Sequence, residues 1–332
     1  MSEVSRYAES TTIPSIEGIR CEKTKERRKI WLIAKSHIRR ILIEILNFFL
    51  NHDIVFRLIG NINKRLELIE SVFLVYPANE EYGLAYAYHK RLCKNKWIPW
   101  FVGIFQQNGK IGIKFAISAS NGQFRDPANK ENLRIVVRRM EELRKIFYAK
   151  RKTFAGILSG ILFSMRLIRE THEAESTVKT VVKAIERVKL LENLPEDIPI
   201  IVLGGRGFIG RRVIAALPKS NTYCVDIAGS RENGWPFYLK GEKAILVNAS
   251  LNSVLDEYLN LFWSKIVVVS DVYPEPSPKT VNRLKKLGCA CYHIAGVKGR
   301  ALPSFPHGYQ GGIPCCAAWL ADEIEPLLFK LV

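Results

Sequence analysis

Short apolar runs alternate with helical patterns through the C-terminal part of the chain. Runs with the length and composition of buried strands precede Gly205 and recur at residues 221–227, 244–248, 266–270 and 290–294. Between most of them, apolar residues fall at helical spacing, as in 211–217, 253–261 and 281–287. Strands that alternate with helices indicate an α/β fold, a doubly wound parallel sheet with helices on both faces. Pro314 predicts the start of a final helix that runs to about Phe329.

The pattern upstream of this region mixes strands and helices. Residues 72–76 have the pattern of a strand, and two further apolar segments flank Gln107-Asn108-Gly109, a hairpin signal. Helical patterns cover residues 82–92, 127–150 and 171–191, of which the second is strongly basic. These segments predict a smaller α+β domain in front of the parallel sheet.

A basic and apolar segment opens the chain. Residues 23–35 carry six lysines and arginines, and residues 30–50 are mostly apolar. Several apolar residues of this segment recur at helical spacing and form one face: Ile38, Ile41, Leu42, Ile45, Leu46 and Phe49. A basic helix with a wide apolar face can bind an anionic membrane surface, here through residues 23–50, and it can equally pack on its own domain.

A glycine motif follows the first strand of the C-terminal region. Gly205, Gly207 and Gly210 form the pattern G-x-G-x-x-G, with Arg206, Phe208 and Ile209 between them. In this context Gly205 makes the turn, Gly207 lets the backbone approach a pyrophosphate, and Gly210 lets the helix pack on the strand. The alternatives are glycines that serve packing only, or a site for another nucleotide.

The acidic residue of this motif favours NAD among the nicotinamide dinucleotides. Asp226 lies 21 residues after Gly205, where an acid accepts hydrogen bonds from a ribose 2′-hydroxyl. Arg231 follows closely and can bind a 2′-phosphate, so NADP stays open. Ligands of such sheets lie beyond the carboxyl ends of the strands. Further candidate residues at these ends are Ala249, Ser250, Asp271 and Tyr273.

These features divide the chain into three predicted parts. Residues 1–70 form a basic helical extension, residues 71–192 a substrate or partner domain, and residues 193–332 a Rossmann dinucleotide-binding domain that ends in a cysteine-bearing helix. The chain of 332 residues has no run of 18 apolar residues, and its seven cysteines show no disulfide framework. We therefore expect a cytoplasmic protein, peripheral to a membrane if residues 23–50 bind one.

The charge is strongly positive and unevenly spread. The formal net charge is +18, and residues 90–152 hold 16 lysines and arginines against 4 acids. Such a surface attracts anionic partners, or it is a solvated face without a partner. Nucleic acid is disfavoured, because the sequence contains no RNP motif, KH loop or zinc knuckle.

A cysteine pair follows Pro314. In the first turn of the predicted helix, Cys315 and Cys316 would have a lowered pKa and act as nucleophiles toward a thioester. The alternative is that both thiols only pack the helix against the sheet. His307 is a candidate general acid or an exposed loop residue, and His172 faces the site or caps its helix. Three alternating ligands, Cys289, Cys291 and His293, lack a metal-binding partner motif, so no metal site is predicted.

Residues 72–328 resemble the cyanobacterial-type long-chain acyl-[acyl-carrier-protein] reductases. The resemblance rests on the order of segments, including Phe154-Ala-Gly-Ile-Leu-Ser-Gly160, Val269-Ser-Asp-Val-Tyr-Pro274, Tyr292-His-Ile-Ala-Gly296 and, at the position of the family's nucleophile, Cys315 or, one residue shifted, Cys316. It implies NADPH as the reductant, an acyl-cysteine, an aldehyde product, and acyl carrier protein or acyl-coenzyme A as the partner. Residues 1–70 have no counterpart in that family.

The sequence therefore predicts an NAD(P)H-dependent oxidoreductase that reduces an acyl thioester to an aldehyde. Two alternatives remain open at this point. One is an NAD(P)-dependent dehydrogenase of an amino acid, imine or hydroxy acid whose cysteines are inert. The other is a non-catalytic adaptor that binds a membrane or partner and keeps the Rossmann fold as a scaffold.

Overall fold

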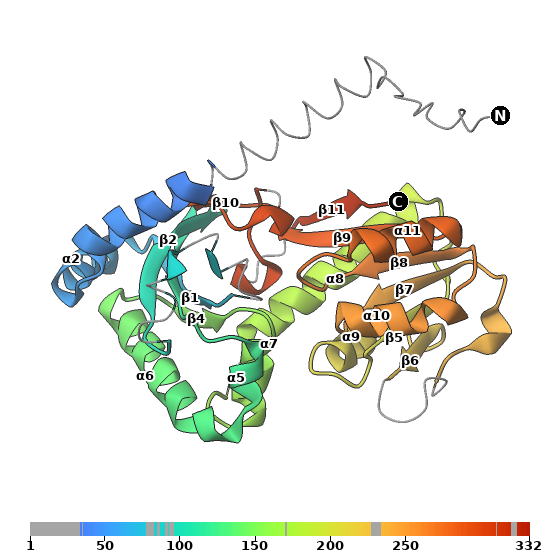
Figure 1. The fold of residues 1–332 in the computed structure, drawn as a ribbon, viewed down its shortest axis with the longest axis horizontal. Helices are drawn as coiled ribbons and strands as arrows, with labels where there is room; N and C mark the ends of the chain where they lie inside the picture. The colour runs from blue at the N-terminus through green and yellow to red at the C-terminus, as the bar shows by residue number, and fades with distance from the viewer. Residues whose placement is uncertain are drawn as a thin grey trace, which may run out of the picture.

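Two sheets, joined by a long helix, make up the structure (Figure 1). The computed structural model describes residues 34, 36–77, 83–84, 87–89, 92, 96–169, 171–226, 234–309, 311–319 and 324–332, with the side chain of His307 left out. The basic run at 23–33, most of the predicted helix 82–92 and Arg231 lie outside the described residues.

Six of the described strands form the C-terminal sheet. Its order is β11-β9-β8-β7-β5-β6, with parallel pairing throughout except for β11, which runs antiparallel to β9. The strands are β5 (Ile200–Leu203), β6 (Thr222–Val225), β7 (Ala244–Asn248), β8 (Ile266–Ser270), β9 (Ala290–Val297) and β11 (Pro326–Lys330). The predicted α/β fold with a parallel sheet is confirmed.

Helices cover both faces of this sheet (Figure 1). On one face, α8 (His172–Leu191) and α9 (Gly210–Ala216) pack on the strands through Val181, Ile185 and Val213. On the other, α10 (Asn252–Tyr258) and α11 (Pro278–Lys286) do so through Leu255, Tyr258 and Leu284. The strands are buried on both sides, which explains why they are continuous apolar runs rather than alternating ones.

The predicted C-terminal helix is wrong. Residues 315–317 form a single 3-10 turn, η5 (Cys315–Ala317), and residues 326–330 form strand β11. Leu328 lies opposite Ile294, and the pairing continues past the strand, where Leu331 N donates to Cys291 O at 2.8 Å. Pro326 has no backbone N–H and so cannot make the hydrogen bond of a helix interior. The open edge of β9 offers the residues after Pro326 backbone hydrogen-bond partners, which favours a strand.

Five described strands form the N-terminal sheet, in the order β10-β2-β3-β1-β4. They are β1 (Ile69–Val75), β2 (Trp100–Gln107), β3 (Lys110–Ala116), β4 (Arg151–Phe154) and β10 (Arg300–Leu302). The β2–β3 hairpin is confirmed, and Asn108 and Gly109 both have positive φ at its turn (46° and 75°). Although β10 comes from the C-terminal third of the chain, it pairs with β2 in this sheet.

The two faces of the N-terminal sheet have different covers. One face packs on the helices α2 (Asp53–Leu66), α5 (Asn121–Arg125), α6 (Lys130–Ile146) and α7 (Ile157–Ser164). The other face buries Phe73 and Phe105 beneath a segment from the end of the chain that includes Phe305, Cys316 and Trp319. The cysteine pair therefore lies where the C-terminal segment meets the N-terminal sheet.

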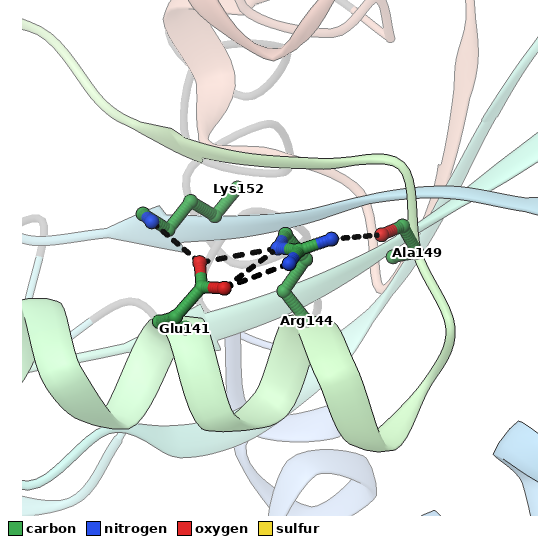
Figure 2. A network of polar contacts seen from close by, with 4 residues as sticks. All are labelled: Glu141, Arg144, Ala149 and Lys152. Atoms are coloured by element: carbon green, nitrogen blue, oxygen red, sulfur yellow. Dashed lines mark hydrogen bonds and ion pairs between the residues drawn. The ribbon is translucent and has the colours of Figure 1, made fainter. Parts of the chain in front are cut away.

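Ion pairs fasten the basic helix α6 to its own sheet (Figure 2). Glu141 pairs with Arg144 at 2.7 Å and with Lys152 of β4 at 2.5 Å, and Arg144 also donates to Ala149 O at 3.1 Å. The Arg144 guanidinium is the main cause that lowers the pKa of Glu141 to about 2. Part of the basic charge of this segment is thus neutralised within the fold.

The helix over residues 36–50 packs with a different face from the one its sequence pattern suggests. Ile43 and Asn47 are buried, and Asn47 Nδ2 donates to Phe101 O at 2.5 Å and to Ile43 O at 2.9 Å. Of the predicted apolar face, Leu46 packs on the core, whereas Ile38, Ile41, Ile45 and Phe49 are 50–67% exposed. Among the described residues, no helix combines the length and hydropathy that crossing a membrane requires.

Candidate functional site

The glycine loop after β5 begins with a turn at Gly204. This residue has φ +81°, so the turn is made one residue before the predicted Gly205. The backbone N–H groups of Gly204 and Gly205 both donate to Val225 O, at 2.9 and 3.1 Å. These bonds tie the loop to the end of β6.

Close packing explains two of the motif glycines. A Cβ on Gly205 would lie 2.6 Å from Cys224 Sγ, and one on Gly210 would lie 2.1 Å from Gly204 O. A side chain at either position would push the start of α9 away from the strand. Gly207 is different, because it is exposed and a Cβ there would meet only Gly204 O, at 3.0 Å.

The packing at Gly210 gives a stability prediction. We expect Gly210→Ala to lower the free energy of unfolding by about 3 kcal/mol, since the methyl group would overlap backbone that cannot move independently. Urea unfolding followed by circular dichroism measures the change. Gly122→Ala in α5 is the control, because a Cβ there has no described atom within 4 Å, and its stability should not fall. Equal stabilities of Gly210→Ala and the parent would contradict the close approach.

Two backbone N–H groups of the loop have no acceptor in the described part of the protein. Within the described part of the chain, the N–H groups of Phe208 and Ile209 donate to no protein oxygen. Arg206 and Gly207 beside them are exposed. Unsatisfied N–H groups at the start of a helix are suited to bind a phosphate.

Phe208 connects this loop to the N-terminal half of the molecule. Its ring lies 5.7 Å from that of Phe163 in α7, and a Cβ on Gly160 of the same helix would lie 3.1 Å from it. The Arg212 guanidinium stacks over the Phe208 ring at 4.0 Å. Phe208 thus holds the loop against α7.

Asp226 lies at the end of β6, next to the loop. Its Oδ2 accepts a hydrogen bond from Arg206 N at 3.1 Å, and its backbone oxygen accepts one from the Tyr258 hydroxyl at 3.2 Å. The carboxylate is therefore within hydrogen-bonding distance of the glycine loop. This is the position at which a dinucleotide ribose binds in folds of this class.

The loops after β7 and β8 meet the glycine loop. Ala249 N donates to Leu203 O at 3.0 Å, and a Cβ on Gly204 would lie 3.0 Å from Ser250 Cβ. Asp271 N donates to Asn248 O at 3.2 Å. The strand order reverses between β5 and β7, so these three loops surround the topological switch point where ligands bind.

Cys315 lies beside this group of loops. Its Sγ is 3.9 Å from Asp271 Oδ1 and 3.4 Å from the Thr177 hydroxyl of α8. The structure thus brings together two predicted site residues, Cys315 and Asp271. Cys316 is buried in the apolar cluster beneath the N-terminal sheet, and the half-buried Cys315 packs against that cluster.

The expected lowering of the Cys315 pKa is wrong. Because Cys315–Ala317 form a single 3-10 turn in place of the predicted α-helix, Cys315 does not lie in the first turn of an α-helix, where a thiolate would be stabilised. The hydrogen bond with Cys316 and burial together raise the pKa of Cys315 well above its usual value. Burial, followed by the neighbouring Cys315, also raises the pKa of Asp271 well above its usual value. Both shifts favour the protonated form of the group concerned.

Sequence reasoning missed Glu173, which lies one helical turn before Thr177. Glu173 is 2% exposed, and burial raises its pKa to about 8. The Thr177 hydroxyl, which contacts Cys315 of η5, donates to Glu173 O at 2.8 Å. The signal was present in the sequence, because Glu173, Thr177 and Thr180 interrupt the buried stripe of an amphipathic helix.

The remaining predicted residues take structural positions. Tyr273 stacks on Tyr309 with ring centroids 4.4 Å apart, next to the turn η4 (His307–Tyr309) that carries His307. His172 is half-buried at the first position of α8, whose N-cap is Thr171. The alternating ligands are also in core positions: Cys289 and Cys291 belong to the apolar cluster under α10 and α11, and His293 is 2% exposed.

Comparisons with known proteins give distant structural likenesses only. No family model matches the chain, and no curated protein matches it. A shikimate dehydrogenase in complex with NADP⁺ superposes with a TM-score of 0.37 and 11% identity over 68% of this chain and 84% of its own. A protein assigned as a LacI transcriptional regulator from Bacteroides fragilis superposes with a TM-score of 0.32 and 9% identity, over 79% of this chain and 97% of its own. Both scores are below 0.5, so neither likeness supports a function.

Proposed function

We propose that this protein is an oxidoreductase that uses a nicotinamide dinucleotide, bound at the carboxyl ends of β5, β7 and β8. The observation that carries the proposal is the glycine loop at the switch point of the parallel sheet, with two N–H groups that have no protein acceptor, beside the half-buried acid and thiol of Asp271 and Cys315. Buried titratable groups with strongly shifted pKa values gather at catalytic sites.

The residues present fit such a cofactor. The N–H groups of Phe208 and Ile209 would hold the pyrophosphate, and Asp226 would accept hydrogen bonds from a ribose. The exposed side chain of Arg206, next to Asp226, would meet a 2′-phosphate, so both NAD and NADP are compatible with the loop. When bound, the cofactor supplies a hydride to an electrophilic carbon of the substrate.

Cofactor binding can be tested at Asp226. We expect NADH to bind the parent protein and Asp226→Ala to weaken that binding about tenfold or more, since a charge-assisted hydrogen bond to the ribose is lost. NADPH affinity should fall less, because the same change removes repulsion of the 2′-phosphate. Isothermal titration calorimetry with both nucleotides measures the two constants.

The matched control is Asp197→Ala, which removes an exposed acid at the opposite end of β5. It should leave both affinities unchanged. If the parent protein binds neither nucleotide, the oxidoreductase proposal is wrong and a non-catalytic adaptor remains. Equal losses of nucleotide affinity in Asp226→Ala and Asp197→Ala would mean that the net charge of the protein, not the contact with the ribose, controls binding.

We further propose that the substrate is an acyl thioester and that Cys315 is the nucleophile. The supporting observation is the contact between Cys315 Sγ and Asp271 Oδ1, on the edge of the sheet where the cofactor would bind. Burial is the main cause that raises the pKa of Asp271, and the hydrogen bond with Cys316 and burial raise that of Cys315. A carboxylate with a raised pKa is a stronger base than an exposed one, which suits Asp271 to accept the proton of the neighbouring thiol.

The chain's residues can then perform acyl transfer. Cys315 Sγ forms a bond to the acyl carbon while the bond from that carbon to the carrier sulfur breaks. The thiol proton passes to the ionised form of Asp271 and from there to the departing sulfur, so the carrier leaves as a thiol. Release of the acyl group as an aldehyde, with the hydride that a bound cofactor would supply, would leave Cys315 as a thiolate, which would regain a proton from solvent through Asp271. Acyl carrier protein and acyl-coenzyme A are both anionic donors suited to the basic protein.

A further inference from the structure

We infer that the outer face of the two N-terminal helices binds the surface of an anionic lipid bilayer. The two helices are residues 36–50 and α2 (Asp53–Leu66). They lie at the end of the molecule remote from the six-stranded sheet (Figure 1). This surface is separate from the candidate site, so the inference does not depend on the proposed function.

Each helix has a second apolar face that the fold does not use. In α2 the inner side packs through Phe56 and Ile59, and the close approach of Gly60 to Ile146 O fixes the helix on α6. The outer side nevertheless presents large apolar residues at every fourth position, which places them in a row along the helix: Ile54, Leu58, Ile62 and Leu66. These side chains are 56–75% exposed.

The first helix also exposes large apolar residues. Ile38, Ile41, Ile45, Phe48 and Phe49 are 50–74% exposed and recur at spacings of three and four residues. With Leu68, the segment 38–68 holds ten of the 21 large apolar side chains that are exposed among the described residues. Solitary exposed apolar residues are normal, but a concentration of this kind within 31 residues of the chain marks a binding surface.

Charge identifies the occupant as an anionic bilayer. Exposed cations flank the row on α2, namely Arg57, Lys64 and Arg65. The acid of the same helix, Asp53, is already paired with Arg139 of α6. Upstream, residues 23–35 add six basic side chains in sequence. Phenylalanines and branched apolar residues on one side, with lysine and arginine beside them, are the composition of a helix that lies in the plane of a lipid interface.

Vesicle co-sedimentation of the full-length protein tests this inference. We expect binding to phosphatidylcholine vesicles that contain phosphatidylglycerol, weaker binding at high salt, and little binding to phosphatidylcholine alone. The double variant Ile54→Glu, Leu58→Glu should bind at least about tenfold more weakly, because it removes apolar contacts and adds repulsion. Lys64→Gln with Arg65→Gln should lower binding to the anionic vesicles by about tenfold or more.

The matched control is Leu190→Glu with Leu191→Glu at the end of α8. These leucines are 79% and 55% exposed, against 75% and 59% for Ile54 and Leu58, and the charge change is the same. The control should bind vesicles like the parent, and all variants should melt at similar temperatures. The inference fails if the parent protein does not bind anionic vesicles, or if Ile54→Glu, Leu58→Glu binds as the control does. It fails equally if the parent binds no vesicles but forms a dimer that Ile54→Glu, Leu58→Glu dissociates.

Discussion

Cys315→Ser is expected to lower the turnover of an acyl thioester at least about a thousandfold. A hydroxyl in place of the thiol is a far weaker nucleophile at neutral pH, and Asp271 beside it cannot make up the difference. NADPH affinity should not change, because the glycine loop is untouched. Steady-state oxidation of NADPH with an acyl-coenzyme A, together with intact-mass detection of the acyl adduct, measures the effect.

Cys316→Ser is the matched control for that experiment. Cys316 is 8% exposed within the apolar cluster beneath the N-terminal sheet, so its replacement should cost about 1 kcal/mol of stability and leave turnover nearly unchanged. An adduct on Cys316 would exchange the roles of the two residues. If activity persists when both cysteines are serine, the cysteines are inert and the alternative dehydrogenase of an amino acid, imine or hydroxy acid gains support.

Glu173→Gln is expected to stabilise the protein at alkaline pH. The pKa of Glu173 is raised by burial from 4.5 to about 8, so the folded state holds its proton where the unfolded state has lost it. Ionising the buried Glu173 carboxyl lowers the free energy of unfolding. This cost is absent below the pKa of the unfolded state, grows as the pH rises, and is complete above pH 8. The shift corresponds to about 5 kcal/mol at full ionisation. Gln is neutral at every pH and avoids this cost.

Urea unfolding of the parent and the variant between acid and alkaline pH tests the linkage. The parent should lose stability steadily from about pH 5 to about pH 8, and Glu173→Gln should show a flatter profile. Glu175→Gln serves as the control, since it changes an exposed carboxylate in the same turn of α8. Parallel profiles for the parent and Glu173→Gln would show that Glu173 is not held in a buried, protonated form.

A role of Glu173 in proton transfer would appear in the same variants. A carboxyl group that titrates near the working pH is suited to general acid or base catalysis. If Glu173 only supports the fold, kcat of Glu173→Gln should depend on pH as it does in the parent. If Glu173 moves a proton, the change of kcat with pH near pH 8 should be absent in the variant.

The sequence by itself determined the parallel sheet and the position of the glycine loop. Strands buried on both faces must be continuous apolar runs, so Ile200–Leu203 and Ile266–Ser270 were visible as strands before any contact was known. The hairpin at Asn108-Gly109 was equally local, since the turn needs residues that tolerate positive φ. These features depend on neighbours in the chain and on burial, which composition reveals.

Only the tertiary structure decided the state of the cysteines and the end of the chain. Leu327 to Phe329 are apolar in either conformation, and the open edge of β9, far away in sequence, selects the strand. Cys315 lies in the 3-10 turn η5 in contact with Thr177 and Asp271, and its hydrogen bond with Cys316 and burial raise rather than lower its pKa. Whether an apolar helical face packs inward, as Ile43 does, or outward, as Ile45 does, is likewise decided by which side the neighbouring sheet covers. Hydrophobic periodicity gives a helix its faces, but the physical partner of each face comes from residues that the local pattern does not contain.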